Sequence, residues 1–548
     1  MKNKIENPEK SEFRNAVRAM LLTTVILFGF NYFFGTKPTQ QVAEEAKTQP
    51  TSVVEQVVLE TPQVVENQPK AEPVLFENEY LKTMFNPAVG GFNDASLLKY
   101  KETLDEKSPF VSVLNPDYFT SLMWVSKDVQ MPTINAYWQK DETSSTDKKQ
   151  VFVYQNEAVQ IKREVSLDDK YMLTLTDTVT NLKAEPIKAY QQGFISRKIE
   201  AQPQVSTVHQ GFVGYLNNEL VEEKYDEDEK IFSGRTTSGW LGFTDKYWQS
   251  LMVLDKNDSV STSFTFDKGI YKAEFETDNI VIQPQTSVSK TLHLFVGAKD
   301  IDVINAYQKD LNINHFDLSI DFGWFRFLTQ PFLHFLNYLY GLIGNMGVAI
   351  LIFATFIRLL LLPIATKSYE SMAKMRKVQP KMKVLQNRFK QDPRRLQIEM
   401  ANLYRREKIN PASGCLPLLL QIPVFFALYK VLSISINMRQ APFFGWIQDL
   451  SMPDPLSVFN AFGYFDFNLP AFLTIGVWPI LMGITMYVQQ KLSPAPADKT
   501  QARVMQFLPI IFTLMMASFA SGLIIYWTWS NILSIFQQKY IMKKVGVE

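Results

Sequence analysis

The chain has 548 residues, of which 46% are hydrophobic, and its formal net charge at pH 7 is +1. This length allows several domains, and the near-zero net charge hides local asymmetry, so it indicates no partner by itself. The single cysteine, Cys415, excludes a disulfide framework and a cysteine metal site within one chain.

Residues 1–35 predict an N-terminal membrane anchor. Basic residues precede the apolar run 19–34, and the GTKPTQQ that follows holds no small-x-small cleavage site. These features favour a retained anchor over a cleaved signal peptide. Residues 36–75 are rich in Pro, Gln, Glu, Thr and Val, with too little apolar surface to offset the entropy of ordering. We expect a flexible linker there.

Residues 76–315 predict one large β-domain, a sandwich. Short segments of alternating polarity, rich in β-branched residues, are separated by Asp, Asn, Gly and Pro. The clearest segments are 150–156, 158–167, 170–181 and 287–297. The pattern of 300–311 predicts a closing helix.

Residues 320–345 predict an aromatic-rich helix with isolated Arg326 and His334. A helix inside a membrane bundle would explain its apolar residues. Its Trp, Tyr and Phe content better fits an amphipathic helix that lies in the membrane interface.

Five apolar runs predict membrane spans, at 346–365, 415–436, 469–488, 505–520 and 523–538. The last two are divided at Ser521-Gly522 and cover only about 21–24 Å each, less than a bilayer core of about 30 Å. Either they form a hairpin that thins the membrane locally or they are not spans. Tyr526, Trp527 and Trp529 in the otherwise apolar last run favour the hairpin.

The charges of the loops predict the topology. Segment 366–411 carries thirteen Lys or Arg against four Asp or Glu, whereas 437–468 carries one against three. The loop 489–504 and the tail 539–548 are also basic. The positive-inside rule places the three basic segments in the cytoplasm. With the anchor, this gives six spans, both termini inside and the β-domain outside.

Segment 366–411 predicts a basic helical hairpin. Apolar residues recur at helical spacing until Gln391-Asp392-Pro393, and a second helix follows. Most of this apolar stripe is expected to pack on the second helix. The excess of nine positive charges favours docking of anionic lipids, RNA or an acidic protein; the alternative is a solvated hairpin that only sets topology. The predicted docking residues are Lys374, Arg376, Lys377, Lys381, Lys383, Arg394, Arg395, Arg405 and Arg406.

Arg358 lies inside a predicted span, where a charge costs about 2.5–3.5 kcal/mol on insertion scales. It lies nine residues before Lys367, about 13.5 Å along a helix, which is deep for simple snorkelling. The spans from 346 onward contain no Asp or Glu to pair with it. We therefore favour a hydrated cavity, open to the cytoplasm, over a lone snorkelling side chain. Candidate lining residues are Gln421, Thr485, Ser530 and Asn531.

Several motifs of catalysis are absent. The sequence has no GxxxxGK[ST] loop and no HExxH, its four His lie outside the cytoplasmic-side spans, and those spans hold no acid. These absences argue against a P-loop ATPase, an intramembrane protease and a proton-coupled transporter. We expect no cofactor, no metal and no bond chemistry. A wet, positively charged cavity suits the passage of polar polypeptide into the membrane.

Five long stretches, in a characteristic order, carry a family likeness. They are FGWFRFLTQP at 322–331, TFIRLLLLPIATKSYESMAKM at 355–375, NPASGCLPLLLQIPVFFALYKVL at 410–432, MRQAPFFGWIQDLS at 438–451 and LPIIFTLMMASFASGLIIYWTWSNILSIFQQ at 508–538. Together they closely resemble the Oxa/YidC/Alb family of membrane protein insertases. The anchor and the large outer β-domain resemble the family's Gram-negative form, in which that domain is a β-supersandwich.

The resemblance implies an insertase and foldase of the bacterial inner membrane that is not an enzyme. Its partners would be nascent membrane proteins, the ribosome, the Sec translocon and anionic lipids, and it would act as a monomer or in transient assemblies. The rival hypothesis is a small-solute transporter or channel, for which the sequence shows no internal repeats. A carbohydrate-active β-domain would rest on fold analogy alone.

The resemblance also implies the site. Arg358 matches a family arginine in a hydrophilic groove that is open to cytoplasm and lipid and releases clients laterally. A groove tyrosine of the family falls at Trp527, next to Tyr526, and a groove threonine falls at Ala354, next to Thr355. The implied groove residues are thus Arg358, Thr355, Gln421, Tyr526 and Trp527.

Overall fold

The structure is a computed structural model that describes residues 72–87, 90–133, 136–146, 148–199, 208–225, 230–256, 258–407, 409, 416–457, 475–494 and 499–546. The predicted anchor and nearly all of the predicted linker lie outside the described residues. The chain divides into two compact units, with the boundary between Ser319 and Ile320. We call them the β unit and the helical unit.

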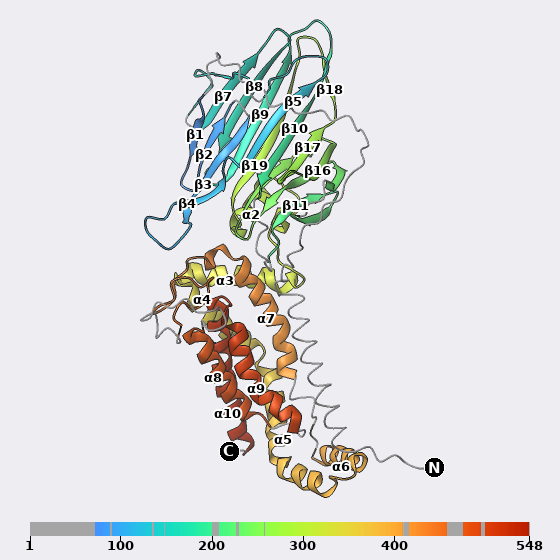
Figure 1. The fold of residues 1–548 in the computed structure, drawn as a ribbon, viewed down its shortest axis with the longest axis vertical. Helices are drawn as coiled ribbons and strands as arrows, with labels where there is room; N and C mark the ends of the chain where they lie inside the picture. Colours follow the sequence, from blue (N-terminus) through green and yellow to red (C-terminus); the bar gives the residue numbers. More distant parts are fainter. Residues whose placement is uncertain are drawn as a thin grey trace, which may run out of the picture. The chain divides into compact units, whose positions relative to one another are not determined.

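The β unit holds three antiparallel sheets (Figure 1). The first has the order β1 (Val74–Glu77), β2 (Leu81–Asn86), β3 (Gly91–Lys101) and β4 (Phe110–Leu114). The second has the order β13 (Lys230–Thr236), β16 (Val260–Asp267), β17 (Ile270–Thr277), β10 (Ile187–Lys198) and β18 (Ile280–Ile282), and β5 (Tyr118–Ser126) also pairs with β10. The third has the order β12 (Glu219–Lys224), β11 (Gly211–Leu216), β14 (Gly239–Thr244), β15 (Trp248–Leu254), β19 (Ser287–Ala298), β9 (Met172–Asn181), β8 (Val159–Leu167), β7 (Lys149–Gln155) and β6 (Gln139–Lys140).

Alternating side chains build the core of the β unit. Strand β8 buries every second residue, since one face of a strand packs inward and the other does not. Aromatic side chains such as Trp124, Trp240 and Phe212 fill the interior. Helix α2 (Ile301–Asp310), capped by the Asp300 carboxylate, and the short η1 (Phe316–Ser319) end the unit. The predicted β-sandwich and its closing helix are confirmed.

The helical unit is a bundle of packed helices with a two-helix extension (Figure 1). Helix α4 packs against α3 and α10, and α8 packs between α9 and α10, while α5 and α6 extend from one end. Their bounds are α3 (Arg326–Ile343), α4 (Met346–Leu360), α5 (Leu362–Arg388), α6 (Pro393–Arg406), α7 (Leu416–Ile434), η3 (Ile436–Met438), α8 (Val477–Leu492), α9 (Lys499–Met516) and α10 (Ser521–Val545).

Several helix ends differ from the predicted spans. Helix α4 ends at Leu360, and α5 continues after a 67° bend through the whole first arm of the predicted hairpin. Helix α10 extends past 538 to Val545. A change from apolar to basic residues marks a change of environment but does not stop a helix, because Lys and Arg are good helix formers.

Hydropathy alone gives a weaker membrane signal than the sequence motifs. Among the described residues, no single helix combines the length and the apolar character of a membrane span, and one pair, α4 with α5, passes that test only across its bend.

Candidate functional site

Arg358 lies in the last turn of α4 with a partly buried side chain. Its Nη2 donates a 2.7 Å hydrogen bond to the Tyr369 hydroxyl, and its guanidinium carbon lies 5.9 Å from the centre of the Tyr369 ring. The Arg358 Nε is buried and has no hydrogen-bond partner among the described residues. The partner that the described chain does supply is neutral, so it leaves the positive charge of Arg358 in place.

The chain bends between Arg358 and its partner. Pro363 lies in the first turn of α5. Because proline has no N–H, it cannot donate to the carbonyl four residues earlier, and its ring favours a break in the helix at that point. Helix α5 leaves α4 at 67°, and Tyr369 on α5 hydrogen-bonds to Arg358 across this bend.

Gln421 and Tyr526 join two helices beside Arg358. The Gln421 side-chain amide on α7 donates a 2.9 Å hydrogen bond to the hydroxyl of Tyr526 on α10. Tyr526 is only 2% exposed. Of the predicted groove residues, Gln421 and Tyr526 are hydrogen-bonded to each other, whereas the hydrogen bond of Arg358 goes to Tyr369.

Thr355 and Trp527 differ in their surroundings. The Thr355 hydroxyl bonds to the Leu351 carbonyl and accepts a 3.0 Å hydrogen bond from Nε1 of Trp529 on α10. Trp527 packs instead against the rings of Phe425 and Phe512, with centroids 4.7 and 5.8 Å away. Trp527 therefore joins α7, α9 and α10 through aromatic contacts, and its neighbour Tyr526 supplies the polar group.

Further polar side chains continue along α10. Asn531 donates a 3.1 Å hydrogen bond to Thr485 on α8, and Gln537 lies 3.4 Å from the Thr366 hydroxyl on α5. Gln538 is 1% exposed, and its amide nitrogen and oxygen have no partner among the described residues. Buried amides normally find partners. This stretch of α10 therefore carries buried polar side chains that face α5 and α8.

Sequence reasoning missed three of these residues. Tyr369 lies in the predicted hairpin, and nothing local marks it as the partner of a residue before the bend. Gln538 stands at the end of a predicted span, where its polarity alone was the signal. Lys430, inside another predicted span, pairs with Asp321 at 2.6 Å, and this second charge in an apolar run could have been noticed.

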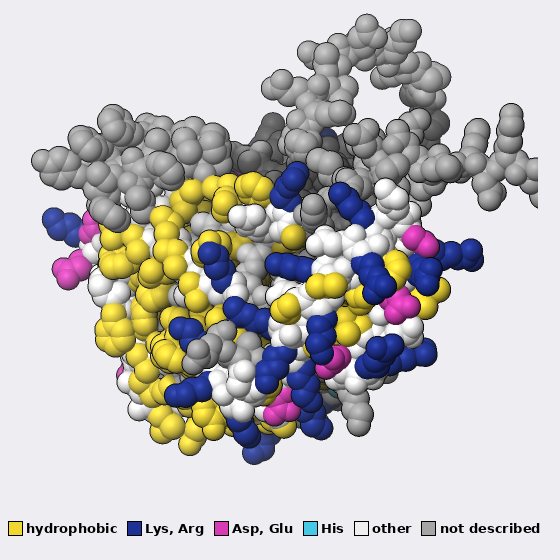
Figure 2. All heavy atoms as spheres, turned by 90° about the horizontal axis from the view of Figure 1, so that it is seen from below, with side chains coloured by type: hydrophobic (Ala, Val, Ile, Leu, Met, Phe, Trp, Pro, Cys, Tyr) yellow, Lys and Arg dark blue, Asp and Glu magenta, His cyan; other side chains and the backbone are white. Residues whose placement is uncertain are grey.

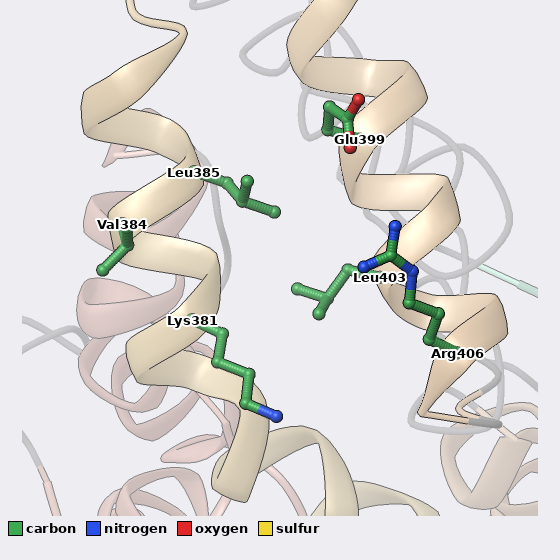
Figure 3. Close-up of a pocket in the computed structure, with 6 residues that line it drawn as sticks. All are labelled: Lys381, Val384, Leu385, Glu399, Leu403 and Arg406. Atoms are coloured by element: carbon green, nitrogen blue, oxygen red, sulfur yellow. The ribbon is translucent and has the colours of Figure 1, made fainter.

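The basic hairpin consists of α5 and α6. Val378 and Met382 on α5 form a buried cluster with Ile409, and the side chains of α6 pack on it. Farther out, a cavity of about 270 Å³ lies between the two helices, where Leu385 and Leu403 point toward each other (Figure 3). Its charged rim is formed by Lys381, Glu399 and Arg406.

The predicted docking residues fall into two groups. Lys377 bonds to the Val545 carbonyl at 2.6 Å, Lys381 pairs with Glu407 at 2.6 Å, and Arg376 lies 3.9 Å from the Met542 sulfur. Lys377 and Lys381 are nevertheless exposed, as are the other predicted docking residues, namely Lys374, Lys383, Arg394, Arg395, Arg405 and Arg406. Figure 2 shows Lys and Arg side chains gathered over this end of the helical unit, beside a hydrophobic flank.

Comparison with known proteins covers both units. Residues 74–335 match the family described as YidC periplasmic domain, and residues 338–547 match the family described as 60Kd inner membrane protein. A membrane protein insertase YidC from Rickettsia bellii (strain OSU 85-389) is 39% identical over 553 residues, which cover 96% of this chain and 98% of the relative. The chain belongs to the YidC family of membrane protein insertases.

Two further proteins similar to this chain are also YidC insertases. One from Rickettsia rickettsii (strain Sheila Smith) is 40% identical over 557 residues, covering 96% of this chain and 99% of the relative. A crystal structure of an active YidC insertase with its first transmembrane domain resolved covers 95% of this chain and 98% of its own, at 17% identity and a TM-score of 0.37.

Membership of the YidC family establishes the general role. The chain is a bacterial inner-membrane protein and an insertase, so nascent membrane proteins are its substrates. It is not an enzyme, and the β unit is the family's periplasmic domain. The described residues contain no group of three His, Cys, Asp or Glu side chains placed to hold a metal ion.

Proposed function

We propose that this insertase receives the polar N-terminal tail of a client in a groove around Arg358 and releases the client sideways into lipid. The groove residues are Arg358, Thr355, Gln421, Tyr526 and Trp527, and the groove is open to the cytoplasm and to lipid. The observation that carries the proposal is the charge of Arg358, which is held by a neutral hydroxyl. An acidic or polar tail is the natural counterpart of such a charge.

The outer surface of the helices supports sideways release. Large apolar side chains are exposed on α4 and on α9, including Phe356, Leu359, Phe507 and Ile510. Such surfaces are stable against lipid tails and unstable against water. A client segment would slide along them while its tail occupies the groove. The polar tail then crosses a shorter and partly hydrated stretch of the bilayer. This lowers the free-energy barrier to moving the tail across the membrane.

The remaining parts of the proposal concern placement and partners. The basic hairpin and both termini face the cytoplasm, since the positive-inside rule applies to their loops. The exposed docking residues on α5 and α6 meet the ribosome and anionic lipids, which carry the opposite charge. Helix α3 lies in the periplasmic membrane interface, and its Phe327 and the preceding Trp324 are exposed. The protein acts alone or with the Sec translocon, as a monomer or in transient assemblies.

Crosslinking during synthesis tests the groove. A photoreactive residue at position 355 or 421 should form adducts with a single-span client that has an acidic tail, whereas one at Tyr338, exposed on α3, should not. Arg358→Ala should reduce insertion of this client, and Arg358→Glu should reduce it more because like charges repel. Missing adducts together with normal insertion in both variants would contradict the proposal.

The basic hairpin has a separate test. Arg394→Glu with Arg395→Glu should weaken binding to anionic vesicles and to ribosomes, and the loss should shrink at high salt because salt screens exposed charges. Lys377→Gln provides the matched control, since that side chain is already bonded to the end of α10. Equal binding by the control and the double variant would argue against docking through the outer arginines.

A further inference from the structure

The orientation of Arg358 depends on one side chain across the helix bend. Arg358 and Tyr369 are 11 residues apart, which in a straight helix corresponds to roughly 16 Å along the axis. Side chains on a helix also lean toward its N-terminus, so Arg358 would point away from Tyr369. The 67° bend between α4 and α5 lies between the two residues, and the long side chains of Arg358 and Tyr369 meet across it in a 2.7 Å hydrogen bond.

Tyr369 is itself held in place. Its side chain is 3% exposed and packs in a buried cluster with Ala365, Met372 and Ile541. Ile541 belongs to α10, and the same part of α10 is joined to α5 by the Lys377 bond to the Val545 carbonyl. The Tyr369 hydroxyl is therefore a fixed acceptor, anchored by α5 and α10 together.

The neutral hydroxyl of Tyr369 orients Arg358 without neutralising its charge, which a carboxylate would do. A carboxylate at this position would fix the guanidinium but also neutralise it, and an acidic client would then compete with a permanent ion pair. A hydroxyl fixes one N–H and leaves the charge and the remaining donors available. The buried Arg358 Nε without a partner is one donor left unused by the described residues.

We propose that Tyr369 is the positioning residue that presents the charged Arg358 to the acidic tail of a client. This inference rests on the proposed role of Arg358 in the groove. Tyr369 acts through Arg358 and needs no contact with the client. It determines how well the insertase distinguishes acidic tails from neutral ones.

The test compares two clients that differ only in tail charge, with the full-length protein in membranes. Tyr369→Phe keeps the buried ring and removes only the hydroxyl. It should lower insertion of the acidic-tail client roughly three- to ten-fold, the effect of one lost hydrogen bond, and change insertion of the neutral-tail client less than about two-fold. Tyr404→Phe, which removes a tyrosine hydroxyl from the hairpin cluster, is the matched control and should change neither.

A double-mutant cycle separates positioning from a structural role. Arg358→Ala should abolish the preference for the acidic tail, and adding Tyr369→Phe should cause no further loss, because the two residues act as one unit. Equal losses for both clients, or additive losses with Arg358→Ala, would overturn the positioning role while leaving the groove intact. An Arg358→Ala variant that keeps full preference for the acidic tail would overturn the groove and the positioning role together.

Discussion

Arg163 and Asp177 form the most deeply buried ion pair among the described residues of the β unit. Their side chains are 2% and 0% exposed and 2.6 Å apart. Arg163 also donates to the carbonyls of Gly90 and Leu122, and Asp177 accepts from the Trp124 indole. Every charge is therefore paired and hydrogen-bonded, the condition under which a buried pair is tolerated.

Removal of one partner should be costly. Asp177→Asn leaves an uncompensated guanidinium in the core, and we expect it to lower the free energy of unfolding by about 3–5 kcal/mol. The exposed pair Arg235–Asp278 is the control, since its side chains are 57% and 62% exposed and Asp278→Asn should cost at most about 1 kcal/mol. Denaturant unfolding of the full-length protein, followed by tryptophan fluorescence, measures both. If Asp177→Asn and Asp278→Asn lowered the free energy of unfolding by similar amounts, the buried pair would have no special role in stability.

His293 gives the β unit a dependence on pH. Burial lowers the pKa of this imidazole, and the nearby Asp255 opposes the shift only in part. Because the folded pKa lies below the unfolded value of about 6.5, the unfolded state takes up the proton more readily. The contribution of His293 to stability is complete above about pH 6.5 and is lost as the pH falls.

His293→Gln tests this sign, since glutamine does not titrate and can still bond to Thr174. Between pH 8 and pH 5 the melting temperature of the natural protein should fall more steeply than that of the variant. The two proteins are compared first at pH 8, where both side chains are neutral. If the melting temperatures of the two proteins changed in parallel between pH 8 and pH 5, the pKa of His293 in the folded protein would be an ordinary one.

At the scale of single elements, close packing of α8 on α9 depends on Gly483. A Cβ atom at this position would lie 2.1 Å from the Thr513 hydroxyl oxygen, which bonds to the Pro509 carbonyl. Contacts of this length force a neighbour to move. Small residues let membrane helices approach each other in this way, and here a single glycine fulfils that role.

Gly483→Ala should therefore destabilise the helical unit by about 1–3 kcal/mol, the usual cost of overpacking. Adding Thr513→Ala should recover most of the loss, because the obstructing oxygen is gone. Gly341→Ala on α3 is the control, since a Cβ there meets nothing within 4 Å. The two glycine-to-alanine substitutions raise helix propensity by the same amount. If Gly483→Ala and Gly341→Ala lowered the melting temperature equally, a steric cause at Gly483 would be excluded.

The elements show where sequence reasoning succeeds. Alternation in β8 and β9 and the proline at Pro393 are local signals, and the structure has two strands and a helix start at those places. The partner of a strand is not a local signal. Strand β19 pairs with β9 more than a hundred residues earlier, Ser287 opposite Thr180, and no periodicity within either segment specifies that register.

At the site, too, the sequence carries the local signals but does not specify the partners of the side chains. The charge of Arg358 and the lack of acids in the spans predict an unusual environment from the sequence alone. The identity of its partner was not predictable, because Tyr369 lies 11 residues farther along the chain, beyond a 67° bend, and the angle of a bend is set by packing against other helices. Likewise, Trp527 and Tyr526 are adjacent in sequence, and only the rotation of α10 decides which one faces Gln421.

For the whole molecule, the uneven distribution of charge predicts the orientation in the membrane. Cysteine labelling in intact cells checks it, after Cys415→Ser removes the natural thiol. A membrane-impermeant maleimide should label Glu106→Cys, exposed in a loop of the periplasmic β unit, without further treatment. It should label Gln391→Cys, exposed between α5 and α6, only after the inner membrane is permeabilised. Labelling of both positions in intact cells would contradict a cytoplasmic hairpin, and the basic surface in Figure 2 would then need a periplasmic partner.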